Sequence, residues 1–172
     1  FAASPRAREL TDLVTRFVTE EIEPVVEQYH QDVARGGDRA TWAESPIMGD
    51  LRSKARAQGL WNLFLPVGHD QPYATRYGTH GGAGLTNLDY APVAEAMGRA
   101  TTLAPYVLNC NAPDTGNMEV LLKYGTEEQK QTWLEPLLDG QIRSMFGMTE
   151  PGVASSDATN MAATAALDGD EV

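Results

Sequence analysis

The residues whose types and spacing could support chemistry lie in one run, MFGMTEPGVASSDATNM, which occupies residues 145–161. Its first half has the composition of a strand, which would deliver Thr149 into a loop of small residues. These small residues are Pro151, Gly152, Ala154, Ser155 and Ser156. Small side chains permit close backbone approach, and exposed amides and hydroxyls can bind the polar atoms of a flat heteroaromatic ring or an amide-bearing chain. Spacing alone leaves a second interpretation equally open, namely a turn whose Ser and Thr side chains satisfy its own backbone.

Other site chemistries have weaker support in the sequence. The three histidines, His30, His69 and His80, are far apart and have no recognised ligand spacing, so we expect no metal site. The glycines of residues 81–84 precede a helix-like stretch, but neither the lysine of a phosphate-binding P-loop nor a preceding strand accompanies them. Cys110 is the single cysteine, which excludes an internal disulfide, and its neighbours are typical of a helix end rather than an activated thiol site.

The composition narrows the class of protein further. The chain has 172 residues, 13 Lys plus Arg against 24 Asp plus Glu, and a net charge of −11, so we expect no nucleic-acid partner. A hydrophobic content of 42% and a charged content of 22% are typical of a soluble globular chain. No stretch approaches the roughly 20 apolar residues of a membrane-spanning helix. The lone cysteine is compatible with a reducing compartment, either the cytoplasm or the mitochondrial matrix.

The elements that must position the 145–161 run are predicted to be helices. Apolar residues recur at helical spacing from about Arg8 to Ala34, and Pro24 within them predicts a bend. A second helix is predicted over Pro46–Gln58 with Ser45 as its N-cap. Another helix is predicted over residues 86–98, where a Thr86–Asp89 capping pair precedes Ala91, Ala94 and Met97. The remaining predicted helices cover residues 101–111, bent at Pro105; 113–125; and 126–138, with a Thr126–Gln129 cap. Short connections between them indicate antiparallel neighbours in a bundle.

Residues between and after these helices have different compositions. Glycines are expected to break the chain over 34–40, residues 60–66 to pack under the bundle, and residues 67–84 to form a loop. Beyond Gly140 the helical spacing of apolar residues ends. Strands are predicted over 143–150 and 163–172, with a hairpin signal at Asp168-Gly169. A ribbon whose second strand has only begun cannot bury a face, so the end at Val172 suggests a truncated β domain.

The run FGMTEPGVASSDATNM, residues 146–161, resembles the flavin-contacting stretch of the acyl-CoA dehydrogenase family, in which a strand leads into Thr-Glu-Pro and a small-residue Ser-Asp loop. The resemblance also includes residues 84–100, residues 109–144 and the amphipathic first helix, hence nearly the whole chain. It implies a mainly α fold. Residues 1–140 would form the helical N-terminal bundle, and residues 141–172 would supply the first strands of a truncated, β-barrel-like middle domain.

Carried over by position, the resemblance implies a site for FAD and for a thioester substrate. Phe146, Met148 and Thr149 would line the flavin, with the Thr149 hydroxyl and nearby amides bonded to the isoalloxazine edge. Ala154, which stands where many members have Gly, and Ser155 would also contact the cofactor. The substrate would contact Ser155, and the doubled serine allows Ser156 to share that role.

The resembling family performs α,β-dehydrogenation of acyl-CoA thioesters: a base removes the α-proton while the β-hydride passes to the flavin. The catalytic base is expected outside this chain, because Glu150 matches a structural position before Pro151. Members commonly form homo-oligomers and pass electrons to an electron-transfer flavoprotein. The alternatives are an oxidase or flavin monooxygenase on the same fold, or a non-catalytic relative that serves as an acyl-binding or interaction module.

Overall fold

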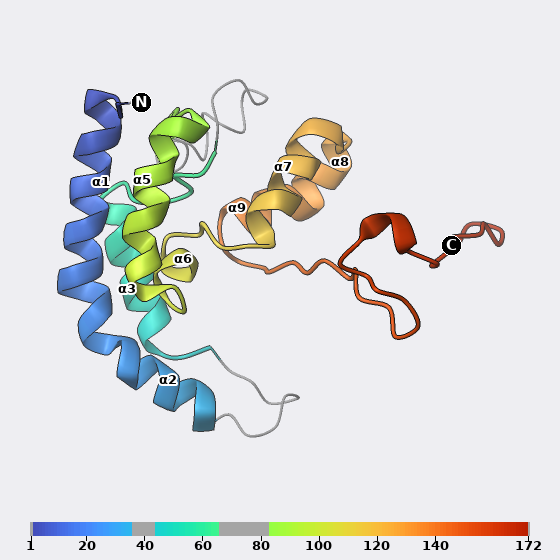
Figure 1. Cartoon of the computed structure of the whole chain (residues 1–172), viewed down its shortest axis with the longest axis horizontal. Coiled ribbons are helices and arrows are strands. Elements are labelled where there is room, and N and C mark those ends of the chain that lie inside the picture. Colours follow the sequence, from blue (N-terminus) through green and yellow to red (C-terminus); the bar gives the residue numbers. More distant parts are fainter. Residues whose placement is uncertain (1, 36–43, 66–82, 172) are drawn as a thin grey trace.

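A computed structural model describes residues 2–35, 44–65 and 83–171, and every regular element in these ranges is helical (Figure 1). The predicted glycine break over 34–40 and the predicted loop over 67–84 fall mostly outside the described residues, as do His69 and His80. The helices form two groups with separate apolar cores. The mainly α fold predicted from the sequence is therefore confirmed.

A long bent helix opens the chain. Helix α1 (Pro5–Phe17) begins at Ser4, whose hydroxyl accepts a hydrogen bond from the Ala7 amide at 3.1 Å. The helix continues through a π-helical turn (Val18–Ile22) and a 3-10 turn (Glu23–Val25) into α2 (Val26–Arg35). Pro24 has no amide to donate, so the i to i−4 pattern is interrupted there, and Figure 1 shows the bend between α1 and α2. The predicted bend at Pro24 is confirmed.

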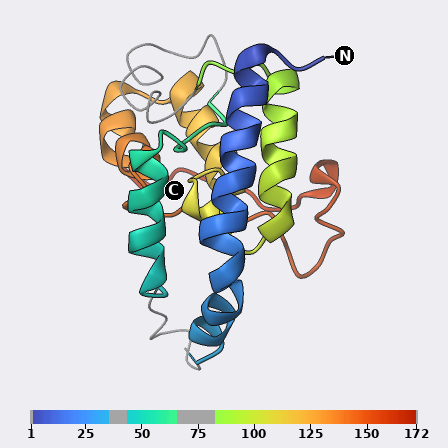
Figure 2. The ribbon, with the colours of Figure 1, turned by 90° about the vertical axis from the view of Figure 1, so that its left-hand side faces the viewer.

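The first core lies where the long helix meets three others. Helix α5 (Asn87–Met97) runs beside α1, and α3 (Ile47–Ala57) flanks the pair, as Figure 2 shows. The short helix α6 (Ala104–Val107) packs against α3. The buried side chains are almost entirely aliphatic and include Leu10, Val14, Ile22, Leu51, Val93 and Leu103. One apolar stripe on each helix is thereby removed from water, which supplies the main driving force for this part of the fold.

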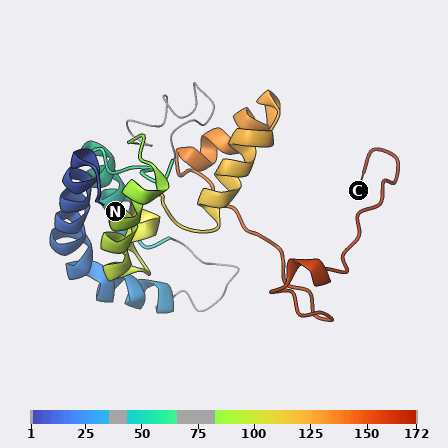
Figure 3. The ribbon, with the colours of Figure 1, turned by 45° about the horizontal axis from the view of Figure 1, so that its top comes forward.

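The second core belongs to a smaller helical group beside the bundle (Figure 3). It contains α7 (Asp114–Tyr124), α8 (Glu127–Gln129), a π-helical turn (Lys130–Leu134) and α9 (Glu135–Leu138). The predicted cap is present, because Thr126 accepts from the Gln129 amide at 3.2 Å and Gln129 accepts from the Thr126 amide at 2.9 Å. Met118, Leu122 and Leu134 fill this core.

Residues 60–65 lie between the two cores and are all buried, which confirms their predicted packing under the bundle. Leu60 and Leu63 belong to the first core, whereas Phe64 and Leu65 belong to the second. Asn62, between Leu60 and Leu63, adopts a φ of 53°, a left-handed conformation that asparagine tolerates better than most residues. One short segment thereby contributes side chains to both cores.

The predicted cap of α3 was wrong. Ser45 does not cap α3 with its side chain; its hydroxyl instead donates to Asp32 at 2.6 Å, and no side-chain cap is found at Pro46. A partner distant in sequence decides this outcome, and local spacing does not contain that information. On α5 the buried residues are Val93, Ala96 and Met97.

The two predicted strands, over 143–150 and 163–172, are not formed in the described part of the C-terminal segment, residues 143–171. The segment leads away from the helices (Figures 1 and 3) and contains one 3-10 turn (Ala158–Asn160). The Asp168-Gly169 signal does make a tight turn, with Asp168 and Glu171 exchanging backbone hydrogen bonds at 2.9 and 3.2 Å. A strand requires a hydrogen-bonded neighbour, and no described residue provides one beyond that turn.

We predict opposite stability changes for two Gly→Ala substitutions. Gly116, inside α7, has open space around a would-be Cβ, so Gly116→Ala should raise the free energy of unfolding by about 0.5–1 kcal/mol. Gly140 follows α9 with φ +68°, and its Cβ would lie 2.9 Å from Cζ2 of Trp61. Gly140→Ala should therefore lower the free energy of unfolding by about 1–3 kcal/mol.

Urea denaturation of both variants and the parent measures this difference. The two substitutions restrict the unfolded chain equally, so the difference between them reports the folded state. Equal changes in both variants would contradict the assigned contact of Gly140 with Trp61.

Candidate functional site

The C-terminal segment is fixed to the helical part of the chain at the start of α7. Asp114, the first residue of α7, is only 1% exposed. One of its oxygens accepts hydrogen bonds from the Ser144 amide at 2.7 Å and from the Ser144 hydroxyl at 2.6 Å. Its other oxygen lies 3.2 Å from a guanidinium nitrogen of Arg143. Arg143 therefore compensates part of the charge of the buried carboxylate, and the carboxylate in turn holds two consecutive residues of the departing segment.

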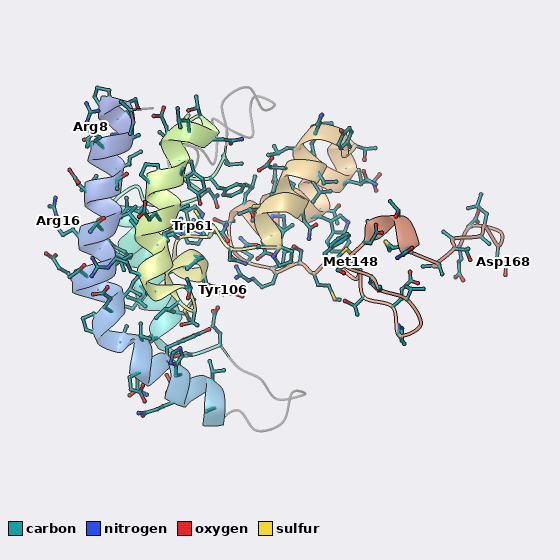
Figure 4. All side chains as sticks on the ribbon, viewed as in Figure 1. Arg8, Arg16, Trp61, Tyr106, Met148 and Asp168 are labelled. Atoms are coloured by element: carbon teal, nitrogen blue, oxygen red, sulfur yellow. The ribbon has the colours of Figure 1, made fainter. Side chains whose placement is uncertain are left out.

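Neighbouring amides complete this anchor. Asn111 donates to Asp114 at 3.0 Å, and Asn117, on the next turn of α7, donates to the Ser144 hydroxyl at 2.8 Å. Arg143 also lies over the ring of Tyr106, 4.8 Å from its centroid. Figure 4 shows Tyr106 on the helical bundle and Met148 where the segment continues beyond it. The Oδ1 atom of Asn111 is buried without a hydrogen-bond partner, the one buried side-chain acceptor among the described residues left in that state.

Beyond the anchor, the predicted flavin-contacting residues are open to solvent. Phe146 is 65% exposed and Thr149 is exposed, while Met148 is half-buried. The Thr149 hydroxyl forms no hydrogen bond with any described residue. An exposed aromatic face and a hydroxyl without a partner are groups that a planar, hydrogen-bonding ring can engage. The donor chemistry of the segment therefore fits a flavin.

Ser155 is placed differently from its neighbours. It is 6% exposed, and its hydroxyl oxygen accepts a hydrogen bond from the Glu150 amide at 2.7 Å. Ala154 and Ser156 on either side are exposed. The Ser155–Glu150 bond brings the predicted contact Thr149, which precedes Glu150, to the same turn as Ser155. Phe146 lies earlier on the segment and is not joined to this turn by a hydrogen bond.

Two carboxylates close the loop around Ser155. The Glu150 carboxylate accepts from the amides of Ala162 and Ala163, both at 3.0 Å. Asp157 accepts from the amide and the hydroxyl of Thr159 at 3.0 and 2.7 Å, and these hydrogen bonds, from the side chain first, hold the pKa of Asp157 below its usual value. Both oxygens of Glu150 are thus engaged in holding the loop rather than directed at a ligand.

A groove of about 560 Å³ lies beside the anchor, between α7, the Lys130–Leu134 turn and residues 142–145. Its lining is mostly apolar and includes Val120, Leu121, Trp133, Ile142 and Met145. The sequence reasoning found neither this groove nor the anchor at Asp114. The one local signal was an acidic residue at a helix start, which is common at helix N-termini without any further role.

Neither a metal-ligand cluster nor a membrane-spanning helix is present among the residues that the structure describes. No three His, Cys, Asp or Glu side chains gather there as a metal site would require. His30 instead makes a hydrogen bond with the Thr102 hydroxyl at 2.9 Å. Among the described helices, none combines the length and apolar character needed to cross a bilayer.

Comparison with known proteins identifies the class to which this fold belongs. Residues 4–141 match the family described as "Acyl-CoA dehydrogenase, N-terminal domain". The match covers all helices from α1 to α9, so the chain belongs to the acyl-CoA dehydrogenase family.

Individual relatives agree with this assignment. The chain is 49% identical over 161 residues to mouse "Acyl-CoA dehydrogenase family member 10", which covers 94% of this chain and 14% of that protein. It is 46% identical over 169 residues to "Probable acyl-CoA dehydrogenase FadE2" of Mycobacterium tuberculosis, covering 98% of this chain and 38% of the relative. A solved structure from Mycobacterium abscessus, assigned as an acyl-CoA dehydrogenase, is 55% identical with a TM-score of 0.80, over 99% of this chain and 40% of the other. The chain thus spans two fifths or less of the length of these relatives.

We predict that Cys110 is unreactive in the folded chain. It packs against both apolar cores, and burial raises the pKa of its thiol to about 11. A higher pKa leaves less thiolate, so alkylation by iodoacetamide near pH 8 should be on the order of 100-fold slower in the folded chain than in guanidinium chloride. As the pH is raised, the alkylation rate of the folded chain should still be rising at a pH where that of the unfolded chain has levelled off. Equal rates in the two states would show that the thiol is not shielded.

We also predict that Ser155 and Ser156 differ in their effect on the loop. Ser155→Ala removes the acceptor of the Glu150 amide, so exchange of that amide proton should become about tenfold faster. Ser156→Ala is the matched control, because the Ser156 side chain is exposed and makes no hydrogen bond to a described residue. Residue-specific exchange measured by NMR tests this, and an unchanged Glu150 amide in Ser155→Ala would refute the assigned bond.

Proposed function

We propose that this chain contributes to a flavin-dependent enzyme that introduces an α,β double bond into an acyl-CoA thioester, with FAD as its cofactor. One observation carries the proposal: in a member of this family, the segment after α9 presents an unpartnered Thr149 hydroxyl and an exposed Phe146 ring beside a closed, small-residue loop. When bound, FAD would accept the β-hydride of the substrate, while a base removes the α-proton and leaves the unsaturated thioester.

The roles that we propose for the segment follow from exposure and chemistry. Phe146 and Met148 would cover the ring system, and Thr149 would donate a hydrogen bond to its polar edge, where negative charge develops on reduction. Ala154 and Ser155 would bring the loop backbone close to the cofactor. The thioester would lie against Ser155 and Ser156, whose loop is held in place by Glu150.

The remaining parts of the proposal concern the whole enzyme. We infer that residues 1–140 are its helical N-terminal domain and that residues 141–172 begin a β-barrel-like middle domain, in which the C-terminal segment would find strand neighbours. The catalytic base would lie outside this chain, since both Glu150 oxygens are engaged by amides. A homo-oligomer and an electron-transfer flavoprotein as electron acceptor complete the proposal.

The cofactor proposal is tested on the protein purified as its own cell produces it. We expect bound flavin, visible as absorbance near the blue end of the spectrum, and bleaching of that absorbance when an acyl-CoA is added without oxygen. Thr149→Val should weaken FAD binding about tenfold through loss of one hydrogen bond, whereas Thr149→Ser should keep most of it. A protein that neither retains nor takes up FAD would contradict the proposal.

The alternatives give different results in the same experiment. Rapid reaction of the reduced flavin with oxygen would indicate an oxidase or flavin monooxygenase on this fold. Binding of acyl-CoA without any flavin-dependent turnover would indicate a non-catalytic acyl-binding relative.

A further inference from the structure

We propose that Asp114 is a positioning residue for the flavin, one that acts at a distance by fixing where the flavin-contacting segment leaves the helical domain. This inference rests on the proposed function for the identity of the ligand. The geometric part, that Asp114 holds the segment in place, is independent of any ligand.

The coordination of the Asp114 carboxylate carries the inference. Four donors reach its two oxygens: the amide and hydroxyl of Ser144 at 2.7 and 2.6 Å, Asn111 at 3.0 Å and Arg143 at 3.2 Å. Two of the four belong to one residue of the segment, and a third belongs to the residue before it. A buried carboxylate with this many donors has little freedom, because moving any donor away leaves a buried charge less well compensated.

The anchor lies close enough to the proposed flavin contacts to control them. Ser144 and Met145 carry hydrogen bonds to the helical domain, the latter from Asn117 to the Met145 carbonyl at 3.4 Å. Thr149 is five residues beyond Ser144, so even a fully extended chain limits it to about 17 Å from the anchor. Releasing Ser144 would therefore enlarge the volume that Thr149 can reach and would disperse the donors that a flavin must find together.

Arg143 alone would not provide this positioning. Its side chain is 34% exposed, and its guanidinium is shared between Asp114, the Tyr106 ring and Asn109 Oδ1, the last at 3.4 Å. An exposed ion pair contributes little by itself. The hydrogen bonds from Ser144 to a carboxylate that is 1% exposed are the stronger and more directional part of the anchor.

The test compares Asp114→Asn with Asp139→Asn. The control removes a similar charge: Asp139 pairs with Arg56 at 3.0 Å at the end of α9 and forms no hydrogen bond or ion pair with residues 143–156 in the described structure. Asp114→Asn should speed exchange of the Ser144 amide, which donates to Asp114, about tenfold or more, with α1 unchanged, because one charged acceptor becomes a neutral group with a misplaced donor. Asp139→Asn should leave residues 144–150 unaffected.

Flavin binding then separates positioning from mere structural support. At saturating FAD, Asp114→Asn should show a shifted visible flavin spectrum and a dissociation constant raised about tenfold, while Asp139→Asn matches the parent. Faster exchange with an unchanged spectrum and affinity would overturn the positioning role. If the parent itself binds no flavin, the proposed function fails, and unchanged exchange in Asp114→Asn would overturn the anchor as well.

A milder variant protects the test against misfolding. Ser144→Ala removes the hydroxyl donor but keeps the Ser144 amide bond to Asp114, so a smaller change in the same direction is expected for both exchange and flavin affinity. No change in either measurement for a folded Ser144→Ala, together with a destabilised Asp114→Asn, would assign Asp114 to the stability of α7 and overturn the proposal.

Discussion

The arrangement of this chain depends on how the last carbonyl groups of α9 are satisfied. Leu138 ends α9, and its carbonyl accepts hydrogen bonds from the Trp61 indole at 2.9 Å and from the Asn62 amide at 2.8 Å. Carbonyls at a helix end have no partner within the helix, and leaving one buried and unbonded is costly. Asn109 adds a donor to the Leu137 carbonyl at 3.1 Å and bonds Asn62 at 2.6 Å. The donors Trp61, Asn62 and Asn109 are sequence neighbours of the first-core residues Leu60, Leu63 and Leu108, whereas the acceptors end the second group, so this buried network fixes the two helical groups in one relative orientation.

The position of the candidate site follows from that orientation. With α9 held against the first helical group, α7 packs against α9. This packing places Asp114 where residues 143 and 144 pass. Arg143 connects the two polar clusters, since it reaches both Asn109 of the helix-end network and Asp114 of the anchor. Arg56, which lies over the Trp61 ring at 3.7 Å, pairs with Asp139 in a half-exposed ion pair that adds little to this orientation. The proposed flavin segment is thus attached to a rigid part of the molecule at one end.

The sequence predicted the features that depend on neighbours along the chain. The bend at Pro24 and the Thr126–Gln129 cap both follow from interactions within a few residues, and both are confirmed. The predicted cap at Ser45 was wrong because Asp32, on α2, accepts the hydrogen bond of its hydroxyl. Asn62 and Asn109 carried no periodic signal at all, since their importance comes from a left-handed backbone and from acceptors on α9. The two strand predictions were wrong for a related reason, because a strand is stable only beside another strand.

The candidate site contains residues whose role cannot be decided from their spacing in the sequence. Spacing left a ligand-binding loop and a self-satisfied turn equally open, and the structure contains features of both: Ser155 serves the backbone of its own loop, whereas Thr149 and Ser156 keep their hydroxyls open. A thioester that takes a hydrogen bond from Ser155 must compete with the Val153 and Glu150 carbonyls, which lie 3.3 and 3.4 Å from its hydroxyl. Ser156 faces no such competition. The two serines, which the sequence could not separate, therefore differ: Ser155 shapes the loop and Ser156 is exposed on it.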